Sequence, residues 1–332
     1  MSGSACIGKR GRLFLSSRSI DLTATAYHVP VLARVVREWA LGSQRAVDAT
    51  AGGGGHAALL RAAGAHVLAI DRDPEALAAA RDFLGGEGFT YLTAPFGSAE
   101  ALAAVAAHQP DRILIDLGVS SHQLDDVARG FTFRPGAALD MRMTPGQGAT
   151  AADLLNSWPE PRLTEAFIVD ADQPLPRARA LARAIVRRRS GATPFRTSDD
   201  LVNAIREVLG PRSGPPDFAR VFQAVRIAVN EEREQLTRAL PAFRDALIPG
   251  GRLGVIAYHS GEDRVVKQAF REWARACICP PRQPVCTCRG HALGSVLTRK
   301  AVGPDAAEVA ANPRARSARF RAFATGEEPH GR

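Results

Sequence analysis

The residues with the clearest chemical potential are four consecutive glycines and a histidine at positions 52–56. Residues 46–49 before them are typical of a short strand, and residues 57–63 after them are mainly strong helix formers. Because glycine has no Cβ, the backbone N–H groups of such a loop can approach a nucleotide closely, and the next helix presents its positive N-terminus. A flexible surface turn is the alternative, but polar residues normally follow such a turn. We therefore predict a nucleotide site here.

Two nucleotides fit this loop. Gly52, Gly54 and Ala57 match the pattern G-x-G-x-x-A of dinucleotide-binding loops, so an NAD-dependent oxidoreductase must be considered, although the match by itself is weak. Asp71 ends the next strand-like run, where a carboxylate can accept hydrogen bonds from both ribose hydroxyls of a nucleotide. That role suits NAD and S-adenosylmethionine equally, so these residues leave both open.

A second group with chemical potential is a cluster of cysteines. Cys277, Cys279, Cys286 and Cys288 fall within twelve residues, and four thiolates can hold a tetrahedral zinc ion. Such a zinc would be structural, since four sulfurs leave no open coordination position. The C-x-C spacing differs from the usual C-x-x-C pair, and surface thiols without a metal are the alternative.

Polar residues of the C-terminal half also qualify as site candidates. Gln223, Arg226 and Asn230 recur on one side of a predicted helix, which indicates either an RNA or active-site contact or an ordinary amphipathic helix. His259 follows the strand-like residues 252–258, and binding sites of α/β proteins form at such strand ends. We favour a substrate contact for His259.

The residues after His259 have a structural explanation. Ser260 and Asp263 have the spacing of a helix-capping box, and Asp263 can pair with Lys267 one turn later.

The elements that must position these residues alternate along the first third of the chain. Strand-like runs at 46–49, 66–70, 89–92 and 112–116 are separated by helices that begin near His56, Pro74 and Ser98, which indicates βαβ units and a parallel sheet. Residues 125–225 contain helical patterns at 151–157, 177–189 and 198–209, and strands return at 252–258 and 314–323. The pattern predicts a doubly wound α/β sheet interrupted by a helical insertion, with ligand at the carboxyl ends of the strands.

Composition narrows the class of partner and the compartment. The 332 residues carry a net charge of +9, which favours a polyanionic partner such as nucleic acid. No apolar run approaches the roughly 20 residues that span a bilayer, so we expect no membrane segment. Residues 1–26 lack the apolar core of a secretory signal, and we expect a disordered extension of a cytoplasmic protein. An organelle transit peptide would have a similar composition.

Three segments after the fourth predicted strand are more distinctive than the glycine loop. Residues 116–126 read DLGVSSHQLDD, residues 129–133 read RGFTF and residues 139–143 read LDMRM. Together with HVPVL at 28–32, FQAVRI at 222–227 and NPRARSA at 312–318, they resemble the RsmH (MraW) family of bacterial 16S rRNA cytosine-N4 methyltransferases. The resemblance runs from about residue 27 to residue 323.

The resemblance implies a Rossmann-like class I fold that binds S-adenosylmethionine. Residues 27–125 and 226–325 would form a discontinuous methyltransferase domain, and 126–225 a helical insertion that binds RNA. The implied reaction methylates the N4 amino group of a P-site cytosine in 16S rRNA, with the 30S subunit as substrate. The implied cofactor contacts are Gly54, Gly55, His56, Asp71, Phe96, Asp116 and Gln123.

Each of these contacts has a physical reason. Asp71 would hold the ribose, Phe96 would pack on the adenine, and Gln123 would hold the methionine end or position its loop. Asp116 is the predicted catalytic residue, because an acceptor for the N4 hydrogens localises the nitrogen lone pair and aligns it with the methyl group. A backbone carbonyl within residues 117–121 and the carboxylate of Asp140 are alternatives.

The substrate side is assigned from the same motifs. The predicted substrate contacts are Asp140, Arg142, Arg226, Asn230 and His259, and the groups that would clasp an unstacked base are Phe131, Phe133 and Met141. Arginines at 187–189 and 314–321 are candidates for phosphate contacts, with solvated surface charge as the alternative.

One departure from the family leaves a question open. Residues 173–175 read QPL where the family has G-E-E, so we assign these residues no role in RNA recognition. An NAD-dependent oxidoreductase does not account for residues 116–143, and a non-catalytic RNA-binding module would not keep the cofactor residues. The oligomeric state, monomer or homodimer, stays open.

Overall fold

The computed structural model describes residues 30–191, 193–283 and 285–326. The extension predicted for residues 1–26 lies outside this part of the chain. None of the described helices is both long and apolar enough to cross a membrane.

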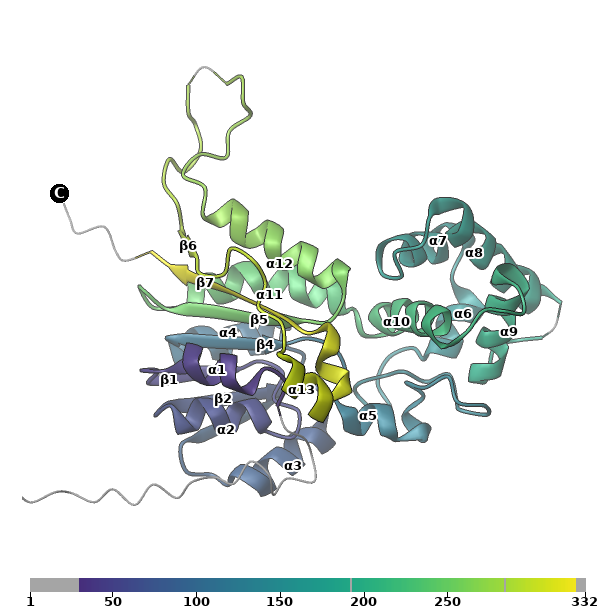
Figure 1. Cartoon of the computed structure of the whole chain (residues 1–332), viewed down its shortest axis with the longest axis horizontal. Coiled ribbons are helices and arrows are strands. Elements are labelled where there is room, and N and C mark those ends of the chain that lie inside the picture. Colours follow the sequence, from purple (N-terminus) through teal and green to yellow (C-terminus); the bar gives the residue numbers. More distant parts are fainter. Residues whose placement is uncertain (1–29, 192, 284, 327–332) are drawn as a thin grey trace, which may run out of the picture.

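A sheet of seven strands forms the centre of the described structure, in the order β3-β2-β1-β4-β5-β7-β6 (Figure 1). Strands β1 to β5 run parallel, while β7 pairs antiparallel with β5 and β6 pairs antiparallel with β7. The bounds are β1 (Arg45–Asp48), β2 (His66–Asp71), β3 (Phe89–Thr93), β4 (Arg112–Asp116), β5 (Arg252–Ala257), β6 (Gly294–Val296) and β7 (Arg319–Thr325). The doubly wound Rossmann-like fold predicted from the sequence is confirmed.

Helices cover both faces of this sheet. Alternate residues of the strands point to opposite faces, so Val47 packs in one layer with Leu236 and Phe270 while Ala46 packs in the other with Trp39 and Leu60. The helices before the insertion are α1 (Ala33–Ala40), α2 (Gly55–Ala62), α3 (Pro74–Leu84), α4 (Ala99–His108) and α5 (Ser121–Asp125). Those after it are α11 (Glu232–Ala246), α12 (Ser260–Trp273) and α13 (Ala306–Ala311).

The predicted strands agree with the structure except at the end of the chain. The five parallel strands lie within one residue of their predicted bounds. The last strand, predicted at 314–323, begins only at Arg319, because residues Pro313–Ser317 form a 3₁₀ helix. Pro313 has no N–H for a strand ladder, and the Asn312 side chain accepts a hydrogen bond from the N–H of Arg314, which starts the helical turn instead.

Between β4 and β5, five helices pack around a core of their own beside the sheet (Figure 1). They are α6 (Ala151–Ser157), α7 (Glu160–Val169), α8 (Leu175–Ser190), α9 (Ser198–Leu209) and α10 (Pro215–Asn230). Helix α6 has its predicted bounds because Thr150 and Asp153 form a reciprocal capping box. Helix α7 was not predicted, and α10 runs through residue 225, where the sequence placed a domain boundary.

Helix α12 begins differently from its prediction. Nδ1 of His259 accepts hydrogen bonds from the N–H groups of Gly261 and Glu262, while the Ser260 hydroxyl contacts Asp172. His259 therefore caps the helix, and the prediction that Ser260 does so was wrong. Only the tertiary structure brings Asp172 within reach of that hydroxyl.

Asp263 of α12 forms a buried ion pair with β7 rather than the predicted pair with Lys267. Nε and one terminal nitrogen of Arg321 donate to its two carboxylate oxygens at 2.6 and 3.1 Å. This two-point contact fastens α12 to the antiparallel strand at the far side of β5. A planar guanidinium fits the carboxylate at both oxygens, which the ammonium of Lys267 does not.

Replacing Asp263 with alanine should therefore destabilise the protein, because the Arg321 guanidinium would stay buried without a partner. We expect the free energy of unfolding in urea to fall by about 3 kcal/mol. The control Glu38→Ala breaks a solvent-exposed pair with Arg34 and should cost less than about 1 kcal/mol. Equal losses for the two variants would contradict this account.

Candidate functional site

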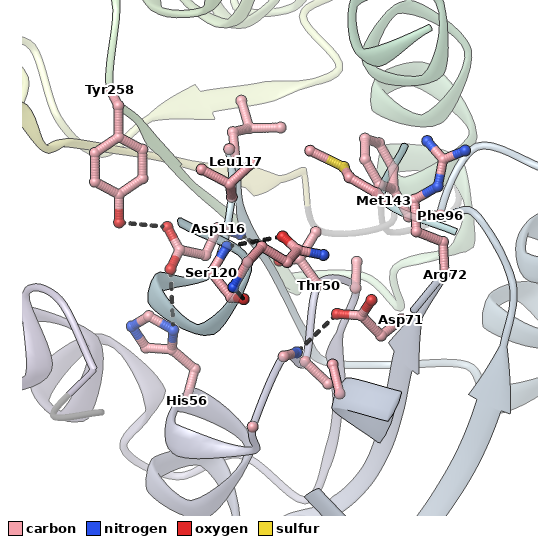
Figure 2. A pocket seen from close by; sticks show the side chains of 18 of the residues that line it. Thr50, His56, Asp71, Arg72, Phe96, Asp116, Leu117, Ser120, Met143 and Tyr258 are labelled. Carbon is pink, nitrogen blue, oxygen red and sulfur yellow. Dashed lines mark hydrogen bonds and ion pairs between the residues drawn. The ribbon is translucent and has the colours of Figure 1, made fainter. Parts of the chain in front are cut away.

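A cavity opens at the carboxyl ends of the parallel strands, where the loops after β1, β2, β3, β4 and β5 meet (Figure 2). Gly52, Gly53 and Gly55 line it beside the side chains of Asp71 and Phe96. The segment before α1 and the one after α13 add Pro30, Val31, Asn312 and Arg314 to its wall. The cavity therefore joins residues from both ends of the described chain.

The glycine loop holds a carboxylate in place through its backbone. The N–H of Gly52, which has a φ of 52°, donates to Oδ2 of Asp71 at 2.8 Å, and the N–H of Asp73 donates to Oδ1 at 2.8 Å. Burial raises the pKa of Asp71, and these two N–H bonds oppose the increase. Each oxygen keeps a free lone pair at the cavity, as a ligand with two adjacent hydroxyls requires.

Of the two glycines predicted to contact a cofactor, Gly55 lines the cavity and Gly54 does not. Gly54 has a φ of 89°, and a Cβ at this position would lie 2.8 Å from Cδ1 of Leu84 in α3. Its lack of a side chain therefore serves the turn into α2 and the packing of α3.

The side chains of His56, Asp116 and Tyr258 form a connected group on the cavity wall (Figure 2). The Tyr258 hydroxyl donates to Oδ1 of Asp116 at 2.9 Å, and Nδ1 of His56 lies 3.4 Å from Oδ2. Nε2 of His56 lies 2.8 Å from the carbonyl oxygen of Val31. A carbonyl can only accept, so Nε2 carries the hydrogen and Nδ1 of the neutral ring presents a lone pair to Asp116.

Burial makes this group suited to holding a proton near neutral pH. It raises the pKa of Asp116 to about 7, an effect that nearby Glu262 adds to and the Tyr258 hydrogen bond opposes. Burial also lowers the pKa of His56 and raises that of neighbouring Asp48 to about 6. Because the pKa of Asp116 is raised and that of His56 is lowered, a proton held between the facing Oδ2 and Nδ1 atoms lies mainly on Asp116.

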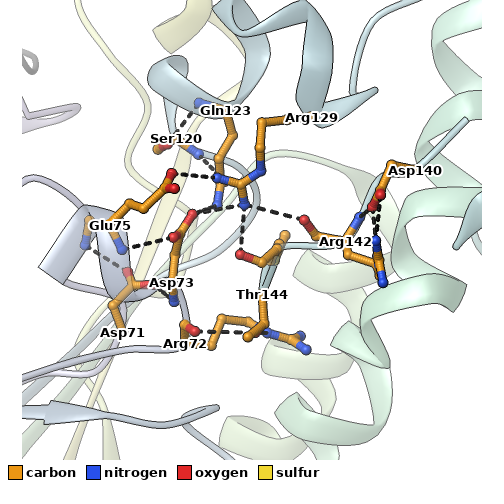
Figure 3. Close-up of polar contacts among 12 residues, drawn as sticks. Asp71, Arg72, Asp73, Glu75, Ser120, Gln123, Arg129, Asp140, Arg142 and Thr144 are labelled. Atoms are coloured by element: carbon orange, nitrogen blue, oxygen red, sulfur yellow. Dashed lines mark hydrogen bonds and ion pairs between the residues drawn. The ribbon is translucent and has the colours of Figure 1, made fainter. Parts of the chain in front are cut away.

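Gln123 shapes the loop after β4 (Figure 3). Its side-chain NH₂ donates to Asp73 at 2.9 Å, and its side-chain oxygen accepts from the N–H of Ser120 at 3.1 Å. The side chain is buried and also lines the cavity. Of the two roles considered for Gln123, these contacts match that of positioning the loop.

Arg129, which the sequence did not single out, joins the same network (Figure 3). Its guanidinium lies 2.9 Å from Asp73 and donates to the carbonyl of Met143 at 2.7 Å. It thereby connects the start of α3 to the segment that enters the insertion. Its place in the RGFTF motif was the only available signal.

Asn230 ties the same segment to α10. Its side chain accepts from the N–H of Met143 at 2.8 Å and donates to the carbonyl of Met141 at 2.7 Å. Neighbouring Arg226 makes a two-point contact with Glu232, at 2.9 and 3.1 Å. Both residues line the cavity as predicted substrate contacts would, but their polar atoms already hold the wall together.

The other predicted substrate residues lie outside the cavity wall. Nε and one terminal nitrogen of Arg142 donate to the two carboxylate oxygens of Asp140 at 2.8 and 2.7 Å. Asp140 is therefore not placed to act as an alternative to Asp116. His259 caps α12, with Nε2 3.0 Å from Glu262 but not aligned as a hydrogen bond. The three groups expected to clasp a base, Phe131, Phe133 and Met141, belong to or pack on the core of the insertion.

The four cysteines predicted as metal ligands do come together. Their sulfur atoms all lie within 4.8 Å of one another, in the segment between α12 and β6. This cluster is remote in the fold from the cavity-lining loops (Figure 1).

Comparison with known proteins now identifies the family. The sequence model of the MraW methylase family matches residues 25–325. The chain belongs to this family. A curated protein of Gemmatimonas aurantiaca named Ribosomal RNA small subunit methyltransferase H is 54% identical over 301 residues, covering 90% of this chain and 95% of that protein. A protein of the same name from Rubrobacter xylanophilus is 45% identical over 315 residues, covering 92% and 98%.

Membership of the MraW methylase family confirms the family predicted from the motifs. It also gives the cavity a class of reaction, the transfer of a methyl group. An NAD-dependent oxidoreductase and a non-catalytic RNA-binding module, both weighed from the glycine loop and the charge, are therefore set aside.

Removing the Tyr258 hydroxyl should change the titration of Asp116. Its hydrogen bond stabilises the ionised carboxylate, so Tyr258→Phe should raise the pKa of Asp116 further above about 7. The measurement is carboxyl ¹³C NMR of protein labelled at aspartate, with the Asp116 signal assigned from Asp116→Asn. Tyr91→Phe, which removes a hydroxyl remote from the cavity, should leave the midpoint unchanged. An unchanged or lower midpoint in Tyr258→Phe would contradict the assignment.

Proposed function

We propose that this member of the MraW methylase family uses S-adenosylmethionine to methylate N4 of a P-site cytosine in 16S rRNA of the 30S subunit, in the cytoplasm. The observation that carries the proposal is the Asp116 carboxylate, held at the carboxyl end of β4 in the cavity with a pKa of about 7. The relatives are named as methyltransferases of small-subunit ribosomal RNA, and the motifs at 116–143 resemble cytosine-N4 methyltransferases.

The residues present fit the cofactor. The free lone pairs of Asp71 match the two ribose hydroxyls, and Phe96 stands near Asp71 on the same wall to pack on the adenine (Figure 2). A Cβ at Gly52 would meet open space, so the loop leaves room for the methionine portion. When bound, S-adenosylmethionine supplies a methyl group on a positively charged sulfur.

Replacing Asp71 with asparagine should weaken binding of S-adenosylhomocysteine. An amide presents one acceptor to the ribose in place of two charged oxygens, and hydrogen bonds to a charged group contribute roughly 1.5–3 kcal/mol. We expect the dissociation constant in calorimetry to rise by about tenfold or more. Asp82→Asn, on the exposed side of α3, is the matched control and should bind as the unaltered protein does. Binding of NAD by the unaltered protein instead would remove the cofactor assignment.

Asp116 supplies what an exocyclic amine lacks as a nucleophile. The N4 lone pair of cytosine is delocalised into the ring, and an acceptor for its N–H hydrogens localises the lone pair toward the methyl group. For the methylated amine to be neutral, N4 would have to lose one proton. Oδ2 of Asp116 accepts this proton, and Nδ1 of His56, 3.4 Å away, shares it.

The groups around His56 bear on how its ring takes part in holding this proton. Burial lowers the pKa of His56, but buried Asp48 and the carbonyl of Val31, 2.8 Å from the opposite ring nitrogen, oppose this decrease. One oxygen of Asp48 is buried without a hydrogen-bond partner, so its charge acts on the ring with little screening. The proton leaves to solvent after the product departs.

For the RNA, the helical insertion at 126–225 is the proposed docking unit, because its entering segment is tied to the cavity wall through Asn230 and Arg129. The arginines at 187–189 are weaker candidates for phosphate contacts. Arg187 and Arg188 pair with Glu207 and Asp200 of α9, and Arg189 donates to the carbonyl of Leu155. Arg314 also pairs with a carboxylate, that of Asp125 at 2.7 Å, but it is the better candidate because it lines the cavity.

The deciding experiment is methyl transfer to 30S subunits from a strain lacking this gene, followed by mass spectrometry of the digested rRNA. We expect one N4-methylcytosine per subunit, at the P site. Asp116→Asn should reduce the single-turnover rate by about a hundredfold or more, the range for loss of a proton-accepting group. Asp245→Asn, exposed on α11, is the control. A methyl group on another atom, or none on rRNA, would overturn the substrate assignment.

The same rate should depend on pH. Asp116 must be ionised to accept the proton, and its pKa is raised to about 7, so the rate should rise as pH increases through about 7. Tyr258→Phe should move this rise to higher pH, because it raises the pKa further. His56→Asn should lower the rate about tenfold, while His108→Asn, outside the cavity, should not. A wild-type profile flat between pH 5.5 and 8.5 would remove the proton-accepting role from Asp116.

A further inference from the structure

The segment between α12 and β6 projects from the edge of the sheet (Figure 1). The described residues of this segment, 274–283 and 285–293, form neither helix nor strand, and Ile278 and Val285 are exposed. Its base is closed by the N–H of Leu293, which donates to the carbonyl of Trp273 at 2.8 Å. A connection this long without secondary structure needs another source of order if it has a fixed shape.

The sulfur atoms of the segment have the spacing of a tetrahedral metal site. Cys286 lies 3.8 Å from Cys277, 3.9 Å from Cys279 and 3.5 Å from Cys288, and Cys288 lies 3.8 Å from Cys277. Zinc–sulfur bonds of about 2.3 Å place the corners of a tetrahedron about 3.8 Å apart. A disulfide would require about 2.05 Å, so the geometry is that of four ligands around one centre.

The backbone and the neighbouring side chains fit the same interpretation. The N–H of Ile278 points at the sulfur of Cys288 at 3.4 Å, as N–H groups do toward metal-bound thiolates. Gly290, with a φ of 70°, allows the chain to turn directly after the second C-x-C pair. The side-chain NH₂ of Gln283 donates to the carbonyl of Val285 and the hydroxyl of Thr287, which fixes the connection between the two pairs.

We propose that Cys277, Cys279, Cys286 and Cys288 bind one Zn²⁺ ion, which gives residues 274–283 and 285–293 their fixed shape. Each thiol loses its proton to solvent as it binds, and no atom changes oxidation state. Four sulfur ligands close the coordination sphere, so the ion is structural and takes no part in methyl transfer. The site is separate from the cofactor cavity, and the proposal does not depend on the proposed RNA substrate.

Metal analysis of the full chain tests the proposal directly. The protein is produced without a histidine tag, purified under reducing conditions without chelators, and measured by inductively coupled plasma mass spectrometry. We expect one equivalent of zinc per chain, and less than a tenth in the double variant Cys277→Ser/Cys279→Ser. Cys6→Ser, the remaining cysteine of the chain, is the matched control and should keep the full equivalent.

Proteolysis supplies a readout independent of metal content. Arg275, Arg282 and Arg289 place trypsin sites within the segment, and a metal-bound loop should resist cleavage there. Removing the metal with a chelator, or the double substitution, should speed cleavage at these sites at least tenfold. Binding of S-adenosylhomocysteine by the cleaved or substituted protein shows that the sheet domain is still folded.

Three results would overturn the proposal. They are less than a tenth of an equivalent of zinc in the unaltered protein grown with added zinc, one equivalent of iron in its place, or an intact mass lowered by two or four daltons through disulfides. Failure of rRNA methylation with zinc present would instead count against the proposed function alone.

Discussion

The fold places the carboxylate of Asp116 in a largely buried position at the carboxyl end of β4, on the wall of the cavity. Burying such a charge is unfavourable unless neighbouring groups compensate it, and the groups around Asp116 come from three separate segments of the chain. Tyr258 donates from the end of β5, and His56 faces it from the start of α2. Thr50 holds the backbone N–H of Asp116, and Val31 fixes the ring of His56. The five parallel strands make this possible, because their carboxyl ends lie at one edge of the sheet.

The compensation is incomplete, and that gives the site its chemistry. A fully paired carboxylate would have a low pKa and would hold a proton poorly. Asp140 illustrates this case, because its two-point contact with Arg142 lowers its pKa. Burial raises the pKa of Asp116 to about 7, because the hydrogen bond from the neutral Tyr258 hydroxyl offsets only part of this effect. Two aspartates at the ends of neighbouring motifs thus have different properties because of their partners.

The cavity is also coupled to the insertion. Arg129 and Asn230 both bond to the segment around Met143, and Arg72 donates to the carbonyl of Asn230 at 2.8 Å. These bonds connect the loop between β2 and α3 with α10 through the short segment around Met143. A shift of the insertion relative to the sheet would therefore displace the cavity wall through these bonds.

The sequence by itself determined the doubly wound sheet and the bounds of its five parallel strands, and it singled out the carboxylates Asp71 and Asp116 and the cysteine cluster, but it did not predict β6. These follow from local signals: alternation of strand and helix formers, capping residues, and motifs that keep their spacing. The tertiary structure alone decided which side chains meet. It brings Tyr258 and His56 into contact with Asp116, and it places Gly54 against α3 rather than at the cavity. It also pairs Asp263 with Arg321 and Asp140 with Arg142. Hydrogen bonds and ion pairs between residues far apart in sequence depend on where the packed elements place them, and no local pattern specifies that.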